Sequence, residues 1–180
     1  MICLPSVRRL AATLACLLAG LTSAQLARAD ASDDTGWFGA KTSQVESPVV
    51  FPGAPGELLH VHITAGGALQ FFVDRASISV QPGQTVRYTL VAKVPGGPRN
   101  ATYEGINCAL RQWKLYALWN DATKGWVAAN TNDWQPIPER GAEHIHSTLF
   151  SDDFCKDSAT NGAAADMAQR IEQGLRTMPY

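Results

Sequence analysis

The sequence has no excess of basic residues and lacks the familiar catalytic motifs, and each absence argues against a class of function. Fifteen Lys and Arg residues stand against 16 Asp and Glu residues, and no basic cluster is present. Nucleic acids and anionic membrane surfaces require a concentrated basic face, so neither is expected as a partner. The chain also has no Gly-x-Ser-x-Gly nucleophile motif and no phosphate-cradling glycine loop with a following Lys. We therefore expect a noncatalytic protein without a catalytic residue or a cofactor.

The apolar run from Leu10 to Leu21 is too short for a membrane span, which needs about 20 residues. Arg8 and Arg9 precede it, and Ala27-Arg28-Ala29 follows with the small-x-small pattern of a signal peptidase site. We predict a signal peptide over residues 1–29, cleavage near Ala29-Asp30, and a periplasmic protein without a transmembrane segment. A lipid anchor on Cys16 is the alternative, but too few apolar residues separate Cys16 from Arg9 for a normal leader.

Cysteine is scarce in the mature chain. Cys3 and Cys16 leave with the signal peptide, so two of the four cysteines remain. A lone pair in an exported domain is most simply a disulfide, which predicts a bond between Cys108 and Cys155. The remaining 151 residues suit one domain and carry 12 basic against 16 acidic residues, a net charge of −4. We divide them into an extended lead-in, residues 30–56, and a single β-rich domain, residues 57–180.

Alternation of apolar and polar residues predicts an α+β domain that is mainly β, a single curved antiparallel sheet or a sandwich. The clearest strand is Gln84 to Val94, where we expect one face in the core and Arg87 and Thr89 on a wet face. A central strand is expected over 111–120, with Trp113, Leu115, Ala117 and Trp119 sharing one face. Further strands are expected over 58–64 and 100–108. A short helix over 143–154 and an amphipathic helix over about 162–176, capped by Asn161, should follow.

The segment from Gln70 to Gln81 is strand-like but contains Asp74 among apolar residues. Burying an unpaired carboxylate costs several kcal/mol, so either the chain bends at Asp74-Arg75 or Asp74 has a buried partner. We expect the bend. Pro82-Gly83 then suits the two central positions of a type II turn.

Several strings occur in order between Leu58 and Cys155. They are FVDRASISV (72–80), VRYTLV (86–91), NATYEGINC (100–108), WKLYA (113–117) and WQPI (134–137). Together they resemble the cryptic neisserial protein-like family of bacterial exported proteins. The resemblance implies a periplasmic or envelope-associated domain, lipid-anchored in some relatives, with no established activity, cofactor or catalytic residue.

The matching strings contain five polar positions that the resemblance marks as candidates: Asp74, Arg87, Tyr88, Tyr103 and Glu104. The family often has Arg immediately before the cysteine of the Tyr-Glu-Gly-Ile string, where this chain has Asn107. A role that requires a cation at that position is therefore not expected here.

All four histidines occur in two His-x-His pairs, His60 with His62 and His144 with His146. On a strand, such a pair places both imidazoles on one face, and several imidazoles brought together in this way can hold zinc or copper. The second pair is expected on a helix, where residues two apart point about 200° from each other. Solvated histidines are the simpler interpretation, and periplasmic metal binding is the alternative.

Asp74 and Glu104 are the carboxylates most embedded in apolar strand sequence, and paired carboxylates serve acid–base and glycosidic chemistry. A hydrolase is therefore a second alternative. The structural interpretation makes Asp74 a turn residue and pairs a buried carboxylate with Arg87 or Arg111. Trp126 and Trp134, near the Asn-rich loop, are candidates for exposed aromatic platforms that bind sugar. Our main hypothesis is a noncatalytic exported domain that binds an envelope component or another protein.

Overall fold

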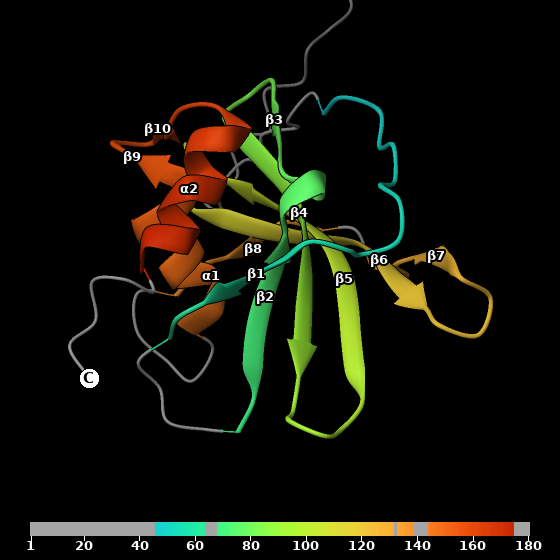
Figure 1. The fold of residues 1–180 in the computed structure, drawn as a ribbon. Helices are drawn as coiled ribbons and strands as arrows, with labels where there is room; N and C mark the ends of the chain where they lie inside the picture. The colour runs from blue at the N-terminus through green and yellow to red at the C-terminus, as the bar shows by residue number, and fades with distance from the viewer. Residues whose placement is uncertain (1–45, 64–67, 132, 139–143, 175–180) are drawn as a thin grey trace, which may run out of the picture. The chain divides into compact units, whose positions relative to one another are not determined.

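The computed structural model describes residues 46–63, 68–131, 133–138 and 144–174 (Figure 1). The predicted signal peptide, its cleavage site and Cys16 lie outside these residues. Eight strands form the main sheet: β1 (Leu58–Val61), β2 (Gln70–Asp74), β3 (Ser79–Gln81), β4 (Thr85–Lys93), β5 (Arg99–Asn107), β6 (Gln112–Asn120), β7 (Gly125–Ala128) and β8 (Gln135–Pro136).

All strand pairs of this sheet are antiparallel, in the order β1-β2-β4-β5-β6-β7, with β3 beside β4 and β8 beside β6. The sheet is curved, and the chain then forms α1 (His144–Thr148), the π-helical segment η2 (Leu149–Phe154) and α2 (Ala164–Gly174). Between η2 and α2, β9 (Cys155–Lys156) and β10 (Ala159–Thr160) make a two-stranded ribbon. The prediction of a mainly β domain with C-terminal helices is confirmed, and a single curved sheet replaces the sandwich alternative.

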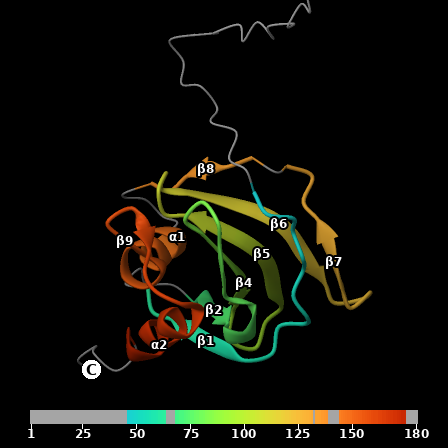
Figure 2. The same ribbon diagram turned by 90° about the horizontal axis from the view of Figure 1, so that it is seen from above.

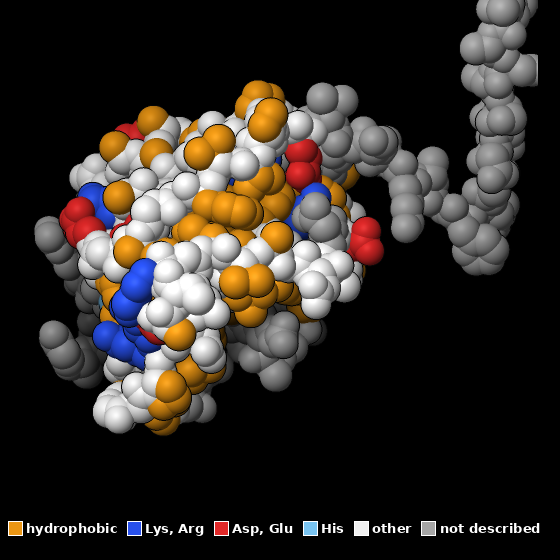
Figure 3. All heavy atoms as spheres, turned by 90° about the vertical axis from the view of Figure 1, so that its right-hand side faces the viewer, with side chains coloured by type: hydrophobic (Ala, Val, Ile, Leu, Met, Phe, Trp, Pro, Cys, Tyr) orange, Lys and Arg blue, Asp and Glu red, His pale blue; other side chains and the backbone are white. Residues whose placement is uncertain are grey.

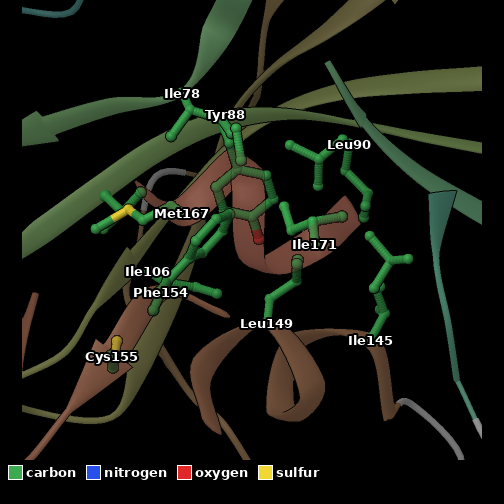
Figure 4. Packing of buried hydrophobic residues seen from close by; sticks show 14 of the residues in the cluster. Ile78, Tyr88, Leu90, Ile106, Ile145, Leu149, Phe154, Cys155, Met167 and Ile171 are labelled. Carbon is green, nitrogen blue, oxygen red and sulfur yellow. The ribbon is translucent and has the colours of Figure 1, made fainter. Parts of the chain in front are cut away.

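The sheet separates two parts of the chain. Figure 2 shows α1 and α2 on one side, which we call the inner face, and residues 46–52, the N-terminal segment, on the other side, the outer face. The main core lies between the inner face and the helices, where apolar side chains converge (Figure 4). Its fully buried members include Val73, Val86, Tyr88, Ile106, Leu149, Phe154 and Met167.

Strand β4 is buried on both faces, which corrects the expectation of a wet face. Arg87 is 2% exposed and Thr89 is fully buried. The N-terminal segment covers Arg87, and the hydroxyl of Ser77 accepts a 2.7 Å hydrogen bond from the backbone N–H of Thr89. The alternation along β4 does not reveal this cover, because the covering residues come from elsewhere in the chain.

The predicted bend after Asp74 is confirmed. β2 ends at Asp74, and a 3₁₀ turn, η1 (Arg75–Ser77), leads into β3. Asp74 is nonetheless buried, and its carboxylate accepts a 3.0 Å hydrogen bond from the backbone N–H of Gly56. The next turn contains Pro82 and Gly83, and Gly83 has φ of 74°, which glycine adopts without the steric cost of a Cβ.

A register shift between β5 and β6 interrupts the expected alternation of β6. Glu104 pairs with Leu115 while Tyr103 pairs with Ala117, so Tyr116 is the extra residue of a bulge. Because a bulge reverses which residues face each side, Leu115 lies on the inner face and Ala117 on the outer face. The expectation that these two residues share one face is therefore wrong.

Gly105 lies against the ring of Tyr116. A Cβ at Gly105 would stand 2.8 Å from Cε2 of Tyr116, closer than carbon atoms approach. We expect Gly105→Ala to lower the free energy of unfolding by about 1 to 3 kcal/mol, because the buried Tyr116 ring must shift. Urea denaturation measures this, with Gly53→Ala as control, where a Cβ meets nothing within 4 Å. Equal stability of both variants would contradict the packing described.

The C-terminal segment is bonded to the sheet by the predicted disulfide. Cys108 and Cys155 are disulfide-bonded with a Cα–Cα distance of 5.4 Å, which confirms the pairing. Helix α2 buries Met167 and Ile171 as expected, but it starts after Ala163, whose N–H donates 2.9 Å to the carboxylate of Asp166. Asn161 is therefore not its cap. No helix in the described ranges is long and apolar enough to span a membrane.

Candidate functional site

Glu104 is the centre of a buried polar cluster on the inner face. Its Oε2 accepts a 3.0 Å hydrogen bond from the hydroxyl of Tyr88 and lies 2.8 Å from Nε2 of His146, and its Oε1 accepts 2.7 Å from Thr102. Burial, together with the nearby Glu104 carboxylate, raises the pKa of Tyr88 well above its ordinary value. Tyr88 therefore remains a hydrogen-bond donor at neutral pH.

The cluster is enclosed by aromatic rings. The Trp113 ring stacks on His146 with 4.1 Å between centroids, and Phe154 packs on Tyr88 at 5.0 Å. Glu104 is 4% and His146 is 6% exposed. Since both oxygens of the buried Glu104 carboxylate accept hydrogen bonds, and one partner is His146 of α1, the arrangement stabilises the contact between α1 and the sheet. Sequence reasoning placed Glu104 near Arg87 or Arg111, which is wrong, because His146 is brought to it by the tertiary fold.

The histidines of the two His-x-His pairs do not lie together at one site in the described residues. His60 and His62, at the end of β1, have ring centroids 6.5 Å apart, and His60 packs against Phe72. Burial and the proximity of His62 and Lys93 lower the pKa of His60. His146 lies on a helix and contacts Glu104, while the side chain of His144 lies outside the described part. Within the described residues no group of three or more His, Cys, Asp or Glu side chains is arranged to hold a metal ion.

The two carboxylates of the hydrolase alternative lie on opposite faces of the sheet. Glu104 pairs with Tyr88 and therefore shares the inner face with it. Leu90, two residues from Tyr88, pairs with Val73 on that same face. Asp74 follows Val73 and points to the other side, because successive residues of a strand alternate. Asp74 and Glu104 do not face a common cleft, so the geometry gives no support to paired-carboxylate hydrolysis.

The outer face presents Arg87 to the backbone of the N-terminal segment. Its guanidinium donates to the carbonyl oxygens of Ser47 at 2.6 Å and Pro48 at 3.0 Å, and it lies 5.0 Å from the centroid of Tyr116. Burial raises the pKa of Tyr116 to about 12. Among the described residues no carboxylate forms an ion pair with Arg87, so its charge is met by backbone carbonyls and an aromatic ring.

Aromatic residues continue this contact toward β7. The indole N–H of Trp126 donates 2.8 Å to the carbonyl of Pro52. The Phe51 ring lies edge-on to Tyr103 at 6.0 Å and 6.3 Å from Trp126. Burial raises the pKa of Tyr103. At the other end, Lys114 forms a 3.1 Å salt bridge with Glu46 and lies 5.5 Å from the partly buried Trp134 ring.

The N-terminal segment and Trp126 together form an apolar strip on the surface. We use this name for Val49, Val50, Phe51 and Trp126, of which Val50 is 79% and Phe51 is 40% exposed. Figure 3 shows hydrophobic side chains gathered over the middle of this side of the molecule. Beside the strip lies a pocket of about 310 Å³ whose lining includes Val50, Phe51, Gln81, Arg87 and Tyr103. From the sequence, Trp126 was a candidate exposed aromatic residue, whereas residues 49–51 were expected only to order the lead-in, because they carry no periodic signal.

Residues 39–172 match the model of the CNP1-like family. The chain belongs to the CNP1-like family. No curated protein and no solved structure matches it. The sequence strings that resemble this family contribute residues to both faces of the sheet. Tyr88 and Glu104 belong to the buried cluster on the inner face, and Arg87 and Tyr103 lie on the outer face.

In this CNP1-like chain Asn107 takes the position before the cysteine. It is 1% exposed, and its amide donates to the carbonyl of Gly83 at 2.9 Å and lies 3.2 Å from the hydroxyl of Thr85. Its carbonyl accepts 2.8 Å from the N–H of Leu110. Asn107 therefore joins two turns at one end of the sheet.

Proposed function

We propose that this protein is an exported, noncatalytic binding domain of the bacterial periplasm or cell envelope, and that it binds a partner protein through the apolar strip. The leader-like N-terminus supports export. The Cys108–Cys155 disulfide supports an oxidising compartment, because such bonds persist outside the cytosol.

The apolar strip is the observation that carries this proposal. Scattered apolar residues on a surface are ordinary, whereas a contiguous patch marks an interaction surface. Val49, Val50 and Phe51 are consecutive, and all are exposed by 38% or more. Trp126, which contacts Phe51, is of a residue type that contributes strongly to binding energy at protein interfaces.

The strip is held in place and therefore ready to bind. Hydrogen bonds from Arg87 and Trp126 fix the carbonyls on both sides of Val49 to Phe51. Since a backbone segment that is ordered before binding loses less conformational entropy, this arrangement favours affinity. The adjoining pocket offers a recess for one side chain of the partner.

Val50→Asp tests the proposal. The side chain of Val50 is exposed, so the variant should fold, but a charge on the strip must be desolvated in the complex. We expect at least a tenfold, about 1.4 kcal/mol, loss of affinity for the partner captured from envelope extracts and identified by mass spectrometry. Affinity is then measured with the purified pair.

Leu110→Asp is the matched control. Leu110 is 46% exposed and lies in the turn between β5 and β6, away from the residues of the strip. This variant should bind the captured partner as the wild type does. If Val50→Asp binds the partner as well as the wild type does, or if Leu110→Asp loses the partner to the same extent as Val50→Asp, the apolar strip is not the binding surface.

A further inference from the structure

A second cleft lies between the sheet and the helices, apart from the apolar strip. Its volume is about 260 Å³, and it is formed by the end of β1, by α1 and η2, and by α2. The lining residues are Val61, His62, Thr148, Asp152, Asp153, Ile171 and Gly174. They include two neighbouring carboxylates and no Lys or Arg, so the cleft is acidic.

Asp153 is the unusual member of this cleft. It is 6% exposed, yet within the described residues its carboxylate has no hydrogen bond and no ion pair. The carboxylate oxygens are not completely sealed from solvent, because Asp153 lines the cleft. A buried acid without a donor is costly, which makes a missing cationic partner the direct explanation.

The local backbone explains how Asp153 comes to this place. It belongs to the π-helical turn η2, a rare widened helix that occurs often at functional sites. The flanking residues Leu149 and Phe154 are fully buried in the core, which fixes the turn. Arg170, whose charge acts on Asp153, donates its hydrogen bonds to the backbone carbonyls of Asp153 and Asn161 rather than to the carboxylate.

We propose that this cleft binds a small organic cation, with an ammonium group at Asp153 and Asp152 and an aliphatic portion against Val61 and Ile171. The volume is about that of eight or nine water molecules, which suits an alkylamine rather than a large ligand. The described residues offer no three-ligand metal set, so an ammonium donor fits better than a metal ion.

Binding should increase with pH. Burial and Asp152 raise the pKa of Asp153 to about 7, although Arg170 acts in the opposite direction. Burial also raises the pKa of Asp152. His62 is the other titratable group of the lining. Since an ammonium ion requires the ionised carboxylate, affinity should be about tenfold higher near pH 8 than near pH 6.

The test uses the mature protein and 1,4-diaminobutane, followed by calorimetry and by NMR of the backbone amides. We expect saturable binding with shifts at residues of β1, η2 and α2, and no binding of the uncharged 1,4-butanediol. Asp153→Asn should abolish binding of the diamine. Asp121→Asn, which changes an exposed acid outside the cleft, should bind as the wild type does.

The folding of Asp153→Asn is checked by its stability. Because the pKa of Asp153 is higher in the folded than in the unfolded protein, Asp153 contributes most to stability at pH values below its unfolded pKa. This contribution is lost as the pH rises through about 7. The neutral variant should therefore gain melting temperature relative to the wild type near pH 8 more than near pH 5. Absence of diamine binding, equal binding of the diol, or full binding by folded Asp153→Asn would overturn the proposal.

Discussion

Replacing Glu104 by Ala will lower the free energy of unfolding by about 3 to 5 kcal/mol. The change removes the acceptor of Tyr88, His146 and Thr102 at once, and leaves the first two of these polar groups buried without it. Each buried donor left unsatisfied costs about 1 to 3 kcal/mol, and the three losses overlap. Denaturation in urea, followed by tryptophan fluorescence, measures the difference.

Two further variants isolate the buried cluster as the cause. Glu104→Gln keeps the volume and one acceptor oxygen, so we expect a smaller loss than for Ala. Asp121→Ala also removes an acid that accepts hydrogen bonds from three residues, Arg99, Trp119 and Lys124, but on the exposed surface, where ion pairs contribute little. A loss for Glu104→Ala no larger than that for Asp121→Ala would show that the cluster does not stabilise the fold.

Removal of the disulfide by the double change Cys108→Ala and Cys155→Ala will destabilise the domain by about 4 kcal/mol. The bond closes a loop with a sequence separation of 47 and attaches the ribbon and helices to β5. Without it, the unfolded chain gains conformational freedom, whereas the core contacts of Phe154 and Leu149 remain. Thermal unfolding of the wild type and the double variant gives the difference.

Reduction provides the control for the disulfide. The wild type in a reducing buffer should lose stability by a similar amount, and the double variant should not respond to the reductant. If the reductant destabilises both proteins alike, or the double variant is as stable as the oxidised wild type, the disulfide is not a main source of stability.

Local sequence patterns were sufficient wherever neighbours in the chain decide the structure. Alternation predicted β4 and β5, and the single carboxylate in an apolar stretch predicted the bend at Asp74. Cys108 and Cys155, the two cysteines outside the predicted signal peptide, were expected to pair with each other, and they do. The strands and the bend depend on residue type and on spacing within about ten positions, which a sequence displays directly. The disulfide spans 47 positions and followed from the small number of cysteines instead.

Contacts between distant residues were beyond the same reasoning. Glu104 meets His146 across a separation of 42, and Arg87 meets Ser47 across 40. Neither pair leaves a periodic signal, so Arg87 was expected on a wet face and Glu104 beside an arginine. The bulge at Tyr116 was also missed, because one extra residue reverses the faces without changing the composition.

The sequence by itself determined the mainly β class, the CNP1-like family strings, the disulfide and the helical C-terminus. Tertiary structure decided which faces are covered, since the N-terminal segment crosses the outer face and η2 carries Asp153 into a cleft. The physical reason is that burial and charge pairing depend on what packs against a residue in space, whereas periodicity reports only the geometry of its own segment.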